Sequence, residues 1–377
     1  MSEPLYQKLY DSLKHDIVSG RYRPGEQLPT EQEIAVSFGV SKITSKKALS
    51  MLASDGLLIR QKGRGTFVNT ELPEPLARET LPQRALPKIG LIFPQMNAHF
   101  GIAMVSAIAD SCRGRADLLF ALSHGDARKE ENAIVQMLQA PVDGLIVFPG
   151  PFQFLNAHLL QMLIDKYPLV LIDQNIPSIA QTSIGTDNRG AIFLALDYIL
   201  QHGHRNLCVL SPALSNNVLM ERFDAVTAYS ARTGVMFDQQ LWLADTDELS
   251  PEHTDHLRIK IREHLLKHPE ITAVLTFHYT AAVAVSLAAQ EIGRAIGKDL
   301  AVLCFDSPQS DGEKPPFTHI LQDEEGIGRG AVDLLFALMK NPGNDPQNVR
   351  LPARLVEGNS FFSLDPVLPA KHRTDFL

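Results

Sequence analysis

The sequence predicts an α/β protein in which a small, mainly helical head precedes a larger body built on parallel β-sheets. Residues 88–306 alternate near-continuous apolar runs of β type with stretches whose apolar residues recur about every 3.6 positions. That alternation is typical of parallel strands buried on both faces by helices. Residues 70–87, by contrast, contain four prolines and no apolar periodicity. We therefore expect them to form a semi-stiff linker between head and body.

Length and composition limit the class of protein. The chain has 377 residues, of which 45% are hydrophobic and 21% charged, which favours two or three domains with substantial cores. No apolar run approaches the roughly 20 residues that span a bilayer, and the charged N-terminus lacks the apolar stretch of a signal peptide. Cys112, Cys208 and Cys304 are far apart, so neither a disulfide framework nor a zinc site is indicated. We expect a cytoplasmic protein.

Charge is distributed unevenly along the chain. Residues 1–69 hold 10 Lys and Arg against 7 Asp and Glu, whereas the whole chain has a formal net charge of −8. A basic module on an acidic body suits a head that binds nucleic acid, because neutralising phosphates supplies most of the non-specific affinity. Many solvated domains show imbalances of this size, so the charge supports DNA binding only together with specific motifs.

Two helices are predicted at the start of the head. Apolar residues recur at helical spacing from Leu5 to Val18, and the RPGEQLP turn ends that pattern. Thr30 and Glu33 then form a capping box, which starts a second helix that continues through Phe38.

A third helix and a β-ribbon complete the head. Ser41 is placed to cap a helix that runs through about Ala53, and LLIRQ and TFV then form two strands around the glycine-rich tip KGRG. The helix puts Ala48, Leu49 and Leu52 on one face, and Lys42, Ser45 and Lys46 largely on another. Helix, turn, capped helix and basic ribbon together predict a winged helix-turn-helix, whose capped helix enters the DNA major groove.

Three motifs of the head, PGEQLPTEQEIA, FGVSKITSKKAL and GRGTFV, follow one another at fixed spacing. With them, residues 4–68 resemble the DNA-binding domain of the GntR family. Lys42 and Lys46 stand where that family usually has arginine, and lysine lacks the guanidinium fork that binds guanine, so operator preferences of relatives do not transfer directly. The alternative for Lys46 is a solvated helix face. The resemblance implies DNA contacts by Gln32, Ser41, Lys42, Thr44, Lys46, Lys62 and Gly63, to which the wing tip adds Arg64.

The body contains seven runs that we expect to be strands, and it shows no internal sequence repeat. The runs are KIGLIFP (88–94), DLLFALS (117–123), DGLIVFP (143–149), PLVLID (168–173), NLCVLSP (206–212), ITAVLTF (271–277) and LAVLCFD (300–306).

The body lacks the common catalytic motifs. The sequence contains no nucleophile elbow, P-loop, H-E-x-x-H or C-x-x-C, and the glycines of residues 326–330 have the wrong spacing for a dinucleotide loop. His264 and His268 are four residues apart on a predicted helix and could share a metal, but an exposed polar face is favoured. Nothing resembles the cofactor-lysine motif of the aminotransferase branch of GntR proteins. We expect no enzyme, no cofactor and no metal.

A second series of motifs runs through residues 88–362, including IGLIFPQMNAHF, TDNRG, TAVLTFHYTAAVAV and THILQDEEG. In this order they resemble the ligand-binding domain of the LacI family, which is similar to the type I periplasmic sugar-binding proteins. The resemblance implies two α/β lobes joined by three crossings, with ligand between the lobes and a hinge motion transmitted to the heads. The expected first lobe is 88–204 with 322–341, and the second is 205–321 with 342–362, followed by a tail, 363–377.

Ligand-binding residues are expected at the strand ends and the lobe boundary. Planar polar groups suit vicinal hydroxyls, and aromatic faces suit sugar C–H surfaces. Tyr279 departs from the Asp usual in the family, which predicts a bulkier, more aromatic site. Three alternatives remain: Trp242 in the core, Asp187 as a helix cap, and Arg222 with Asp306 as a structural ion pair. The candidates are Asn97, His99, Phe100, Asp187, Arg222, Trp242, Tyr279, Asp306 and Gln322.

Together the two resemblances predict a homodimeric transcription repressor of carbohydrate metabolism, similar to the arabinose-repressor branch. Residues 1–69 would bind operator DNA, and a sugar between the lobes would change operator affinity, most simply by releasing DNA. The alternatives are a solute-binding protein and an α/β enzyme that acts on a small polar carbohydrate. The absent signal peptide and the basic head argue against a transport protein.

Overall fold

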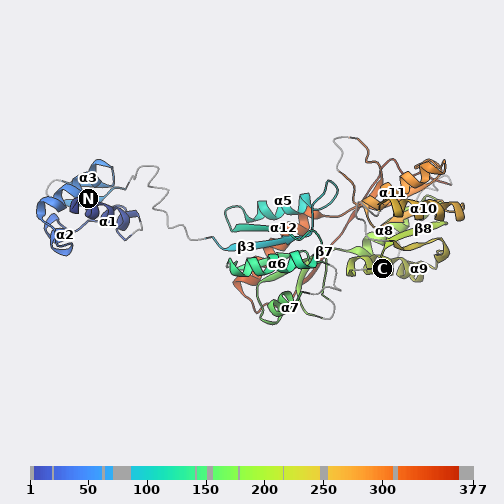
Figure 1. Cartoon of the computed structure of the whole chain (residues 1–377), viewed down its shortest axis with the longest axis horizontal. Coiled ribbons are helices and arrows are strands. Elements are labelled where there is room, and N and C mark those ends of the chain that lie inside the picture. The colour runs from blue at the N-terminus through green and yellow to red at the C-terminus, as the bar shows by residue number, and fades with distance from the viewer. Residues whose placement is uncertain are drawn as a thin grey trace, which may run out of the picture. The chain divides into compact units, whose positions relative to one another are not determined.

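The computed structural model describes residues 4–18, 21–61, 64–70, 86–140, 142–150, 156–176, 179–214, 216–246, 254–308 and 313–364. Contacts divide the chain into two compact units, Met1–Leu86 and Pro87–Leu377, which correspond to the head and the body (Figure 1). Most of the predicted linker and tail lies outside the described residues. Among the described residues, no helix is long and apolar enough to cross a membrane.

The head is a winged helix-turn-helix, as predicted. Its three helices share one core with the ribbon, to which Leu9, Ile34 and Leu49 contribute. Leu5, expected on the apolar face of the first helix, is instead 62% exposed, and the buried stripe of that helix begins at Leu9. The elements are α1 (Leu5–Val18), α2 (Glu31–Ser37), α3 (Lys42–Ser54), β1 (Leu58–Gln61) and β2 (Gly65–Val68).

Side-chain caps fix where the second and third helices begin. Thr30 accepts a hydrogen bond from the Glu33 amide while the Glu33 carboxylate accepts one from the Thr30 amide, which confirms the capping box. Ser41 accepts from the Thr44 amide at 3.1 Å, which confirms it as the cap of α3. Each cap satisfies an amide that the helix itself leaves unpaired.

The body's first lobe is a six-stranded sheet in the order β13-β7-β6-β5-β3-β4, with parallel neighbours throughout. One face packs against α5 and α12 and the other against α6 and α7. The strands are β3 (Lys88–Phe93), β4 (Asp117–Leu122), β5 (Gly144–Val147), β6 (Leu169–Ile172), β7 (Thr182–Thr186) and β13 (Asn348–Leu351). The helices are α5 (Ile102–Cys112), α6 (Ala127–Gln139), α7 (Ala157–Ile164) and α12 (Glu324–Lys340).

The second lobe is a six-stranded sheet in the order β14-β12-β11-β10-β8-β9, covered by α8 and α9 on one face and by α10 and α11 on the other. Its strands are β8 (Leu207–Pro212), β9 (Leu243–Thr246), β10 (Ala273–Thr276), β11 (Ala301–Phe305), β12 (Thr318–Leu321) and β14 (Arg354–Val356). Its helices are α8 (Asn188–Gln201), α9 (Asn217–Thr233), α10 (Thr254–Lys267) and α11 (Tyr279–Glu291).

The two lobes repeat one strand order although their sequences show no repeat. Numbered within each lobe, both sheets run 6-5-4-3-1-2 across the sheet. The one difference is the last strand, because β13 pairs with β7 in parallel whereas β14 pairs with β12 antiparallel. All seven predicted runs form strands. Six of them are buried, whereas β4, at the edge of its sheet, is only partly buried and leaves Phe120 42% exposed.

Two predicted lobe boundaries need correction. Residues 188–204 were assigned to the first lobe, but Ile192 and Leu196 of α8 pack in the second lobe's core with Leu207. Residues 342–362 were assigned wholly to the second lobe, but β13 pairs with β7 of the first. The chain therefore crosses at the ends of β7, β12 and β13. The number of crossings is three, as predicted. The boundaries differ because a helix belongs to the lobe whose sheet buries its apolar face.

Candidate nucleic-acid interface and ligand site

The N-terminal turn of α3 presents polar and basic side chains to solvent. Ser41, Lys42 and Lys46 are exposed, and Thr44 is half-buried. The Ser41 hydroxyl lies 2.8 Å from the Thr44 hydroxyl, which holds both at the start of the helix. Gln32 is exposed on the neighbouring α2. The predicted contacts on these two helices therefore lie on exposed surface, close to their caps.

Ser45 corrects one sequence-based placement. It was grouped with Lys42 and Lys46 on the outer face, but its side chain is fully buried. Its hydroxyl donates to the carbonyl of Glu31 at 2.8 Å and is within 3.0 Å of the carbonyl of Lys42. A buried hydroxyl needs such partners, so Ser45 ties α3 to α2 instead of facing solvent.

The wing is held by a third extended segment. Leu28 donates its amide to Thr66 at 2.8 Å, and Val68 donates its own to Glu26 at 2.9 Å, so residues 25–28 pair along β2. The Gln27 amide side chain donates to the Arg64 carbonyl at 3.0 Å, at the edge of the wing tip. Arg64 is exposed, whereas the predicted contacts Lys62 and Gly63 lie outside the described residues.

In the body, Arg222 of α9 is the centre of a buried polar cluster at the lobe junction. It is 3% exposed. Its Nε donates to Asn188 Oδ1 at 2.9 Å, Nη1 donates to the Phe277 carbonyl at 2.9 Å, and Nη2 donates to Gln322 Oε1 at 3.3 Å. The guanidinium lies over the Phe305 ring, 3.7 Å from its centroid. One side chain thus joins four segments, and its planar face is already occupied by an aromatic ring.

Asp306 and Gln322 continue the cluster. The Gln322 amide donates to both oxygens of the Asp306 carboxylate, at 3.1 and 2.9 Å, and its own oxygen accepts from the Thr186 hydroxyl at 2.7 Å. In this part of the described chain, Arg222 and Asp306 are thus linked through Gln322 and not by a direct ion pair. Burial raises the pKa of Asp306 to about 7, against the opposing effect of the Arg222 guanidinium. Near neutral pH this carboxyl group can therefore either accept or donate a hydrogen bond.

Sequence reasoning missed Asp173, the first-lobe counterpart of Asp306. Each follows the fourth strand of its lobe, adopts a left-handed conformation (φ 63° and 61°) and donates its amide across to the fifth strand, to Ile184 and Ile320 respectively. Asp173 is 7% exposed, and its Oδ1 has no hydrogen-bond partner among the described residues. Burial raises its pKa. The shared signal was visible in the sequence, because VLID and VLCFD are both apolar strands ending in aspartate.

Two further members of the cluster were also missed. Glu221 accepts hydrogen bonds from the side-chain amides of Asn188 at 2.9 Å and Asn217 at 3.3 Å. His278 begins α11, and burial together with the nearby Arg222 lowers its pKa to about 3, so its imidazole is neutral at physiological pH. Neither was singled out as a site residue, although His278 lies within the motif TAVLTFHYTAAVAV, because both act through neighbours that are distant in sequence.

The predicted aromatic residues come from both lobes. The His99 ring of the first lobe stacks on the Tyr279 ring of the second, with centroids 4.8 Å apart. Phe100 packs edge-on against Phe148 in the first-lobe core. Asn97 forms the intervening turn, because its side-chain oxygen accepts from the amides of His99 and Phe100 at 3.2 and 2.9 Å. The loop after β3 is thus ordered by its own asparagine and reaches the second lobe through His99.

Asp187 and Trp242 have structural partners. Asp187 caps α8 by accepting from the Gly190 amide at 2.9 Å, in agreement with the helix-cap alternative. Trp242 packs edge-on against Phe223, with centroids 5.4 Å apart, at the margin of the second-lobe core. Its indole N–H is buried and has no partner among the described residues.

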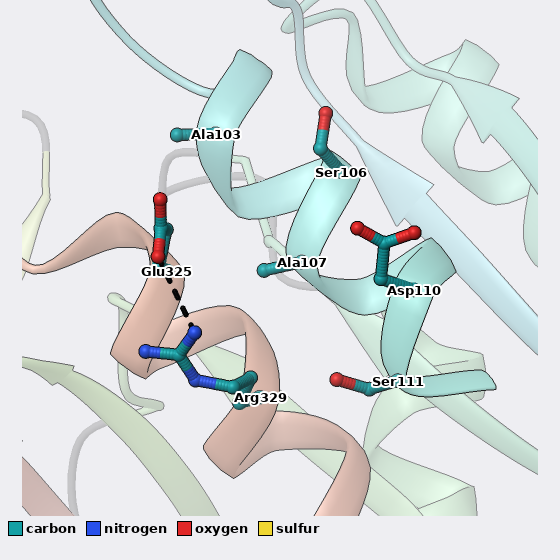
Figure 2. A pocket seen from close by; sticks show the side chains of 7 residues that line it. All are labelled: Ala103, Ser106, Ala107, Asp110, Ser111, Glu325 and Arg329. Atoms are coloured by element: carbon teal, nitrogen blue, oxygen red, sulfur yellow. Dashed lines mark hydrogen bonds and ion pairs between the residues drawn. The ribbon is translucent and has the colours of Figure 1, made fainter. Parts of the chain in front are cut away.

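The histidine pair and the glycine-rich segment have structural roles. His264 hydrogen-bonds to the Leu241 carbonyl at 2.9 Å, and the described residues contain no group of three or more metal-ligating side chains. A Cβ atom at Gly328 of α12 would lie 2.5 Å from the Met104 carbonyl of α5, so this glycine allows close helix packing. Residues of α5 and α12 also line a hollow of about 330 Å³. Figure 2 shows the residues that line it, among them Arg329, which pairs with Glu325 at 3.3 Å.

Comparison with known proteins agrees with this division. Residues 5–68 match the family model described as bacterial regulatory proteins, gntR family, and residues 196–361 match that of a periplasmic binding protein-like domain. The chain is 27% identical over 208 residues to an arabinose metabolism transcriptional repressor of Geobacillus stearothermophilus, covering 54% of this chain and 55% of that protein. It is 24% identical over 296 residues to a ribose operon repressor of Haemophilus influenzae, covering 78% and 86%. The match to the first of these thus spans about half of that relative's length.

Solved structures show the same fold for the body. The transcription regulator CcpA of Lactococcus lactis superposes with a TM-score of 0.61 at 19% identity, covering 73% of this chain and 99% of that one. A lac repressor dimer bound to operator and an anti-inducer gives 0.61 at 20% identity, covering 78% and 100%. The chain therefore combines a domain that matches the gntR family model with a domain that matches the periplasmic binding protein-like model.

Proposed function

We propose that this protein is a ligand-responsive transcriptional repressor of genes for carbohydrate metabolism. The observation that carries the proposal is the presence, in one chain, of an exposed, capped helix beside a basic wing and a buried polar cluster where two lobes meet. The first suits a DNA duplex and the second a small polar molecule. Because it acts on DNA, its place of action is the cytoplasm of a bacterial cell.

Operator binding is assigned to the head. Lys42 and Lys46 would contact phosphates or base edges from α3, and the hydroxyls of Ser41 and Thr44 would contact the backbone near its N-terminus. A homodimer would place two such heads on a near-palindromic site, since a single head buries too little surface for high specificity. The remaining proposed contacts are Gln32, Lys62, Gly63 and Arg64.

Effector binding is assigned to the lobe junction. Arg222, Asp306 and Gln322 already bond to one another, so a sugar would exchange some of these hydrogen bonds for its own hydroxyls. His99 and Tyr279 supply aromatic surface from opposite lobes, and the unpartnered Trp242 N–H is a free donor at the second-lobe margin. Binding would then shift the balance between lobe arrangements and release operator DNA. Asn97, Phe100 and Asp187 are proposed to shape the site around these groups.

One experiment tests both halves of the proposal. Fluorescence anisotropy would follow the full chain on labelled DNA from upstream of its own gene, at about 0.15 M salt, where non-specific binding is weak. A panel of pentoses, hexoses, disaccharides and phosphorylated sugars would be added in turn. We expect preferential binding over scrambled DNA that one sugar abolishes. Binding indifferent to every sugar would contradict the effector class, and binding without sequence preference would contradict the repressor.

The single tryptophan gives an independent readout of the effector. Trp242 is the only tryptophan of the chain, so its intrinsic fluorescence reports changes at the margin of the second-lobe core without a label. A saturable change in emission is expected for the sugar that releases DNA and not for its stereoisomers. The sugar should be recovered unchanged after hours of incubation, whereas turnover would favour the enzyme alternative.

A further inference from the structure

At the start of α3 an apolar side chain is exposed to solvent, while a polar side chain two residues later is buried. Ile43, the second residue of α3, is 82% exposed, whereas Ser45 is fully buried. Single exposed hydrophobic residues are ordinary on protein surfaces. Here, however, the neighbours on the exposed surface are Ser41, Lys42 and Lys46. A β-branched residue is also a poorer helix former than the lysines beside it, so neither solvation nor helix propensity favours isoleucine here.

Helix geometry puts Ile43 on the face proposed to contact DNA. Residues three apart on a helix are surface neighbours, so Ile43 lies beside Lys46. The opposite face is fixed by Ala48, Leu49 and Leu52, which are buried in the head's core. The N-terminal residues of such a helix are those that approach base edges in the major groove. Ile43 is one turn closer than Lys46 to the N-terminus of the helix. If Lys46 reaches a phosphate, Ile43 therefore lies closer to the base edges.

We infer that Ile43 packs against the 5-methyl group of a thymine in the operator and so reads one base pair in each half-site. The isoleucine side chain has no donor or acceptor, and it cannot bind phosphate or the polar edges of guanine, cytosine or adenine. The thymine methyl is the apolar group that the major groove offers. This assignment rests on the proposed function, and it adds an apolar contact to a recognition helix whose predicted contacts are all polar or basic.

Deoxyuridine provides the test, because it differs from thymidine only by that methyl group. The full chain would first select its preferred duplex from a random-sequence library. Each thymine of the selected site would then be replaced singly by deoxyuridine and the affinity measured by anisotropy. For wild-type protein, replacing one particular thymine in either half-site should lower the affinity about four-fold. That is the effect of removing one methyl group from an apolar contact.

Variants identify the residue responsible. Ile43→Ala should bind thymine and deoxyuridine equally at that position, and Ile43→Val should keep most of the difference. Val36, 74% exposed at the end of α2, is the matched control, and Val36→Ala should leave the discrimination intact. Thermal unfolding of each variant should match wild type, because both side chains are exposed.

The outcomes separate this inference from the proposed function. The contact would be overturned if Ile43→Ala still preferred thymine to deoxyuridine as strongly as wild type does. It would also be overturned if wild-type protein bound thymine and deoxyuridine equally at every position. Either result would leave DNA binding established. Loss of discrimination with Val36→Ala as well would mean a general disturbance of the head. If the wild-type chain selects no duplex at all, the repressor proposal fails, and the methyl contact fails with it.

Discussion

The head and the lobe junction place the side chains of their proposed sites in opposite environments. In the head, Ser41, Lys42 and Lys46 are exposed and lie within six residues of one another along the chain. At the junction, Arg222 is 3% exposed and bonds to groups 34, 55 and 100 residues away. A DNA-reading surface must be free to meet a large partner, whereas a site for a small molecule gains strength from excluding water.

That difference sets how each region responds to substitution. Exposed side chains with few partners affect binding and leave stability almost unchanged. Buried side chains with several partners affect both, because their loss leaves other polar groups unsatisfied. Variants of the head and of the junction should therefore separate by which quantity changes, affinity or the free energy of unfolding.

The largest effect is expected from Arg222→Met, which keeps side-chain bulk and removes the donors. It leaves the Asn188, Phe277 and Gln322 oxygens without their partner, so the free energy of unfolding of the body should fall by about 3–5 kcal/mol. Urea unfolding followed by Trp242 fluorescence measures this. Arg329→Met, which removes an exposed ion pair on α12, is the control and should cost less than about 1 kcal/mol. Equal effects of the two would contradict the buried-cluster account.

The pH dependence of the body should reveal Asp306. Its folded pKa of about 7 lies above the ordinary value near 3.9, so the folded state binds more protons between those limits. The stability that this carboxyl group contributes is therefore present at low pH and is lost as pH rises through about 7. Asp306→Asn should remove that dependence, so the difference between variant and wild type should change by about 2 kcal/mol between pH 5 and 7.

A matched control for this titration is Asp323→Asn. Asp323 is exposed and caps α12 by accepting from the Gly326 amide, a role that asparagine can take over. Its unfolding free energy should change between pH 5 and 7 as that of wild type does, because the substitution leaves Asp306 and its partners in place. A pH profile of Asp306→Asn that is parallel to wild type would show that another group titrates in this range.

Lys46→Ala should weaken operator binding without destabilising the head. The loss of one phosphate contact in each subunit should lower the slope of log affinity against log salt by about 2 for the dimer and reduce affinity by about ten-fold. Lys47→Ala is the neighbouring control, because the Lys47 ammonium lies over the Tyr6 ring, 3.4 Å from its centroid, and is not a proposed contact. An unchanged salt slope for Lys46→Ala would place that lysine away from DNA.

The smallest effect is expected from Thr30→Ala. It removes the side-chain half of the capping box, so α2 should lose about 1 kcal/mol of local stability. Amide hydrogen exchange of peptides from residues 31–37 measures this opening, and peptides from the body should be unaffected. Ser50→Ala, an exposed substitution within α3, should leave exchange in α2 unchanged. Faster exchange throughout the chain would mean that head and body unfold together.

Each region was predictable from sequence to the extent that its interactions join residues close together along the chain. The head was predicted element by element, including both caps, because a cap and the amide it satisfies are three residues apart. Leu5 and Ser45 were misplaced. Ser45 bonds to a carbonyl on another helix, and no local pattern records that contact. Seven of the body's twelve described strands were predicted from apolar runs, which burial on both faces favours, whereas β7, β9, β12, β13 and β14 were not predicted.

The lobe junction was predicted only in part. Arg222, Asp306 and Gln322 were identified by resemblance, but Asp173, Glu221 and His278 were not, although they belong to the same cluster. Both aspartates end an apolar strand in the sequence, but only the repeated strand order of the two lobes makes Asp173 and Asp306 equivalent in position. The lobe boundaries were misplaced because the crossings depend on which sheet buries α8 and which strand pairs with β13.

The sequence by itself determined what depends on neighbouring residues: the division into head and body, the start of α2 and α3, and the seven strands that are apolar runs. Only the tertiary structure decided what depends on segments far apart in the chain. In the folded chain Arg222 contacts Gln322, Ser45 is buried and Ile43 is exposed. The physical reason is that helix periodicity and capping are local, whereas the burial and pairing of a polar side chain are set by whatever the fold packs around it.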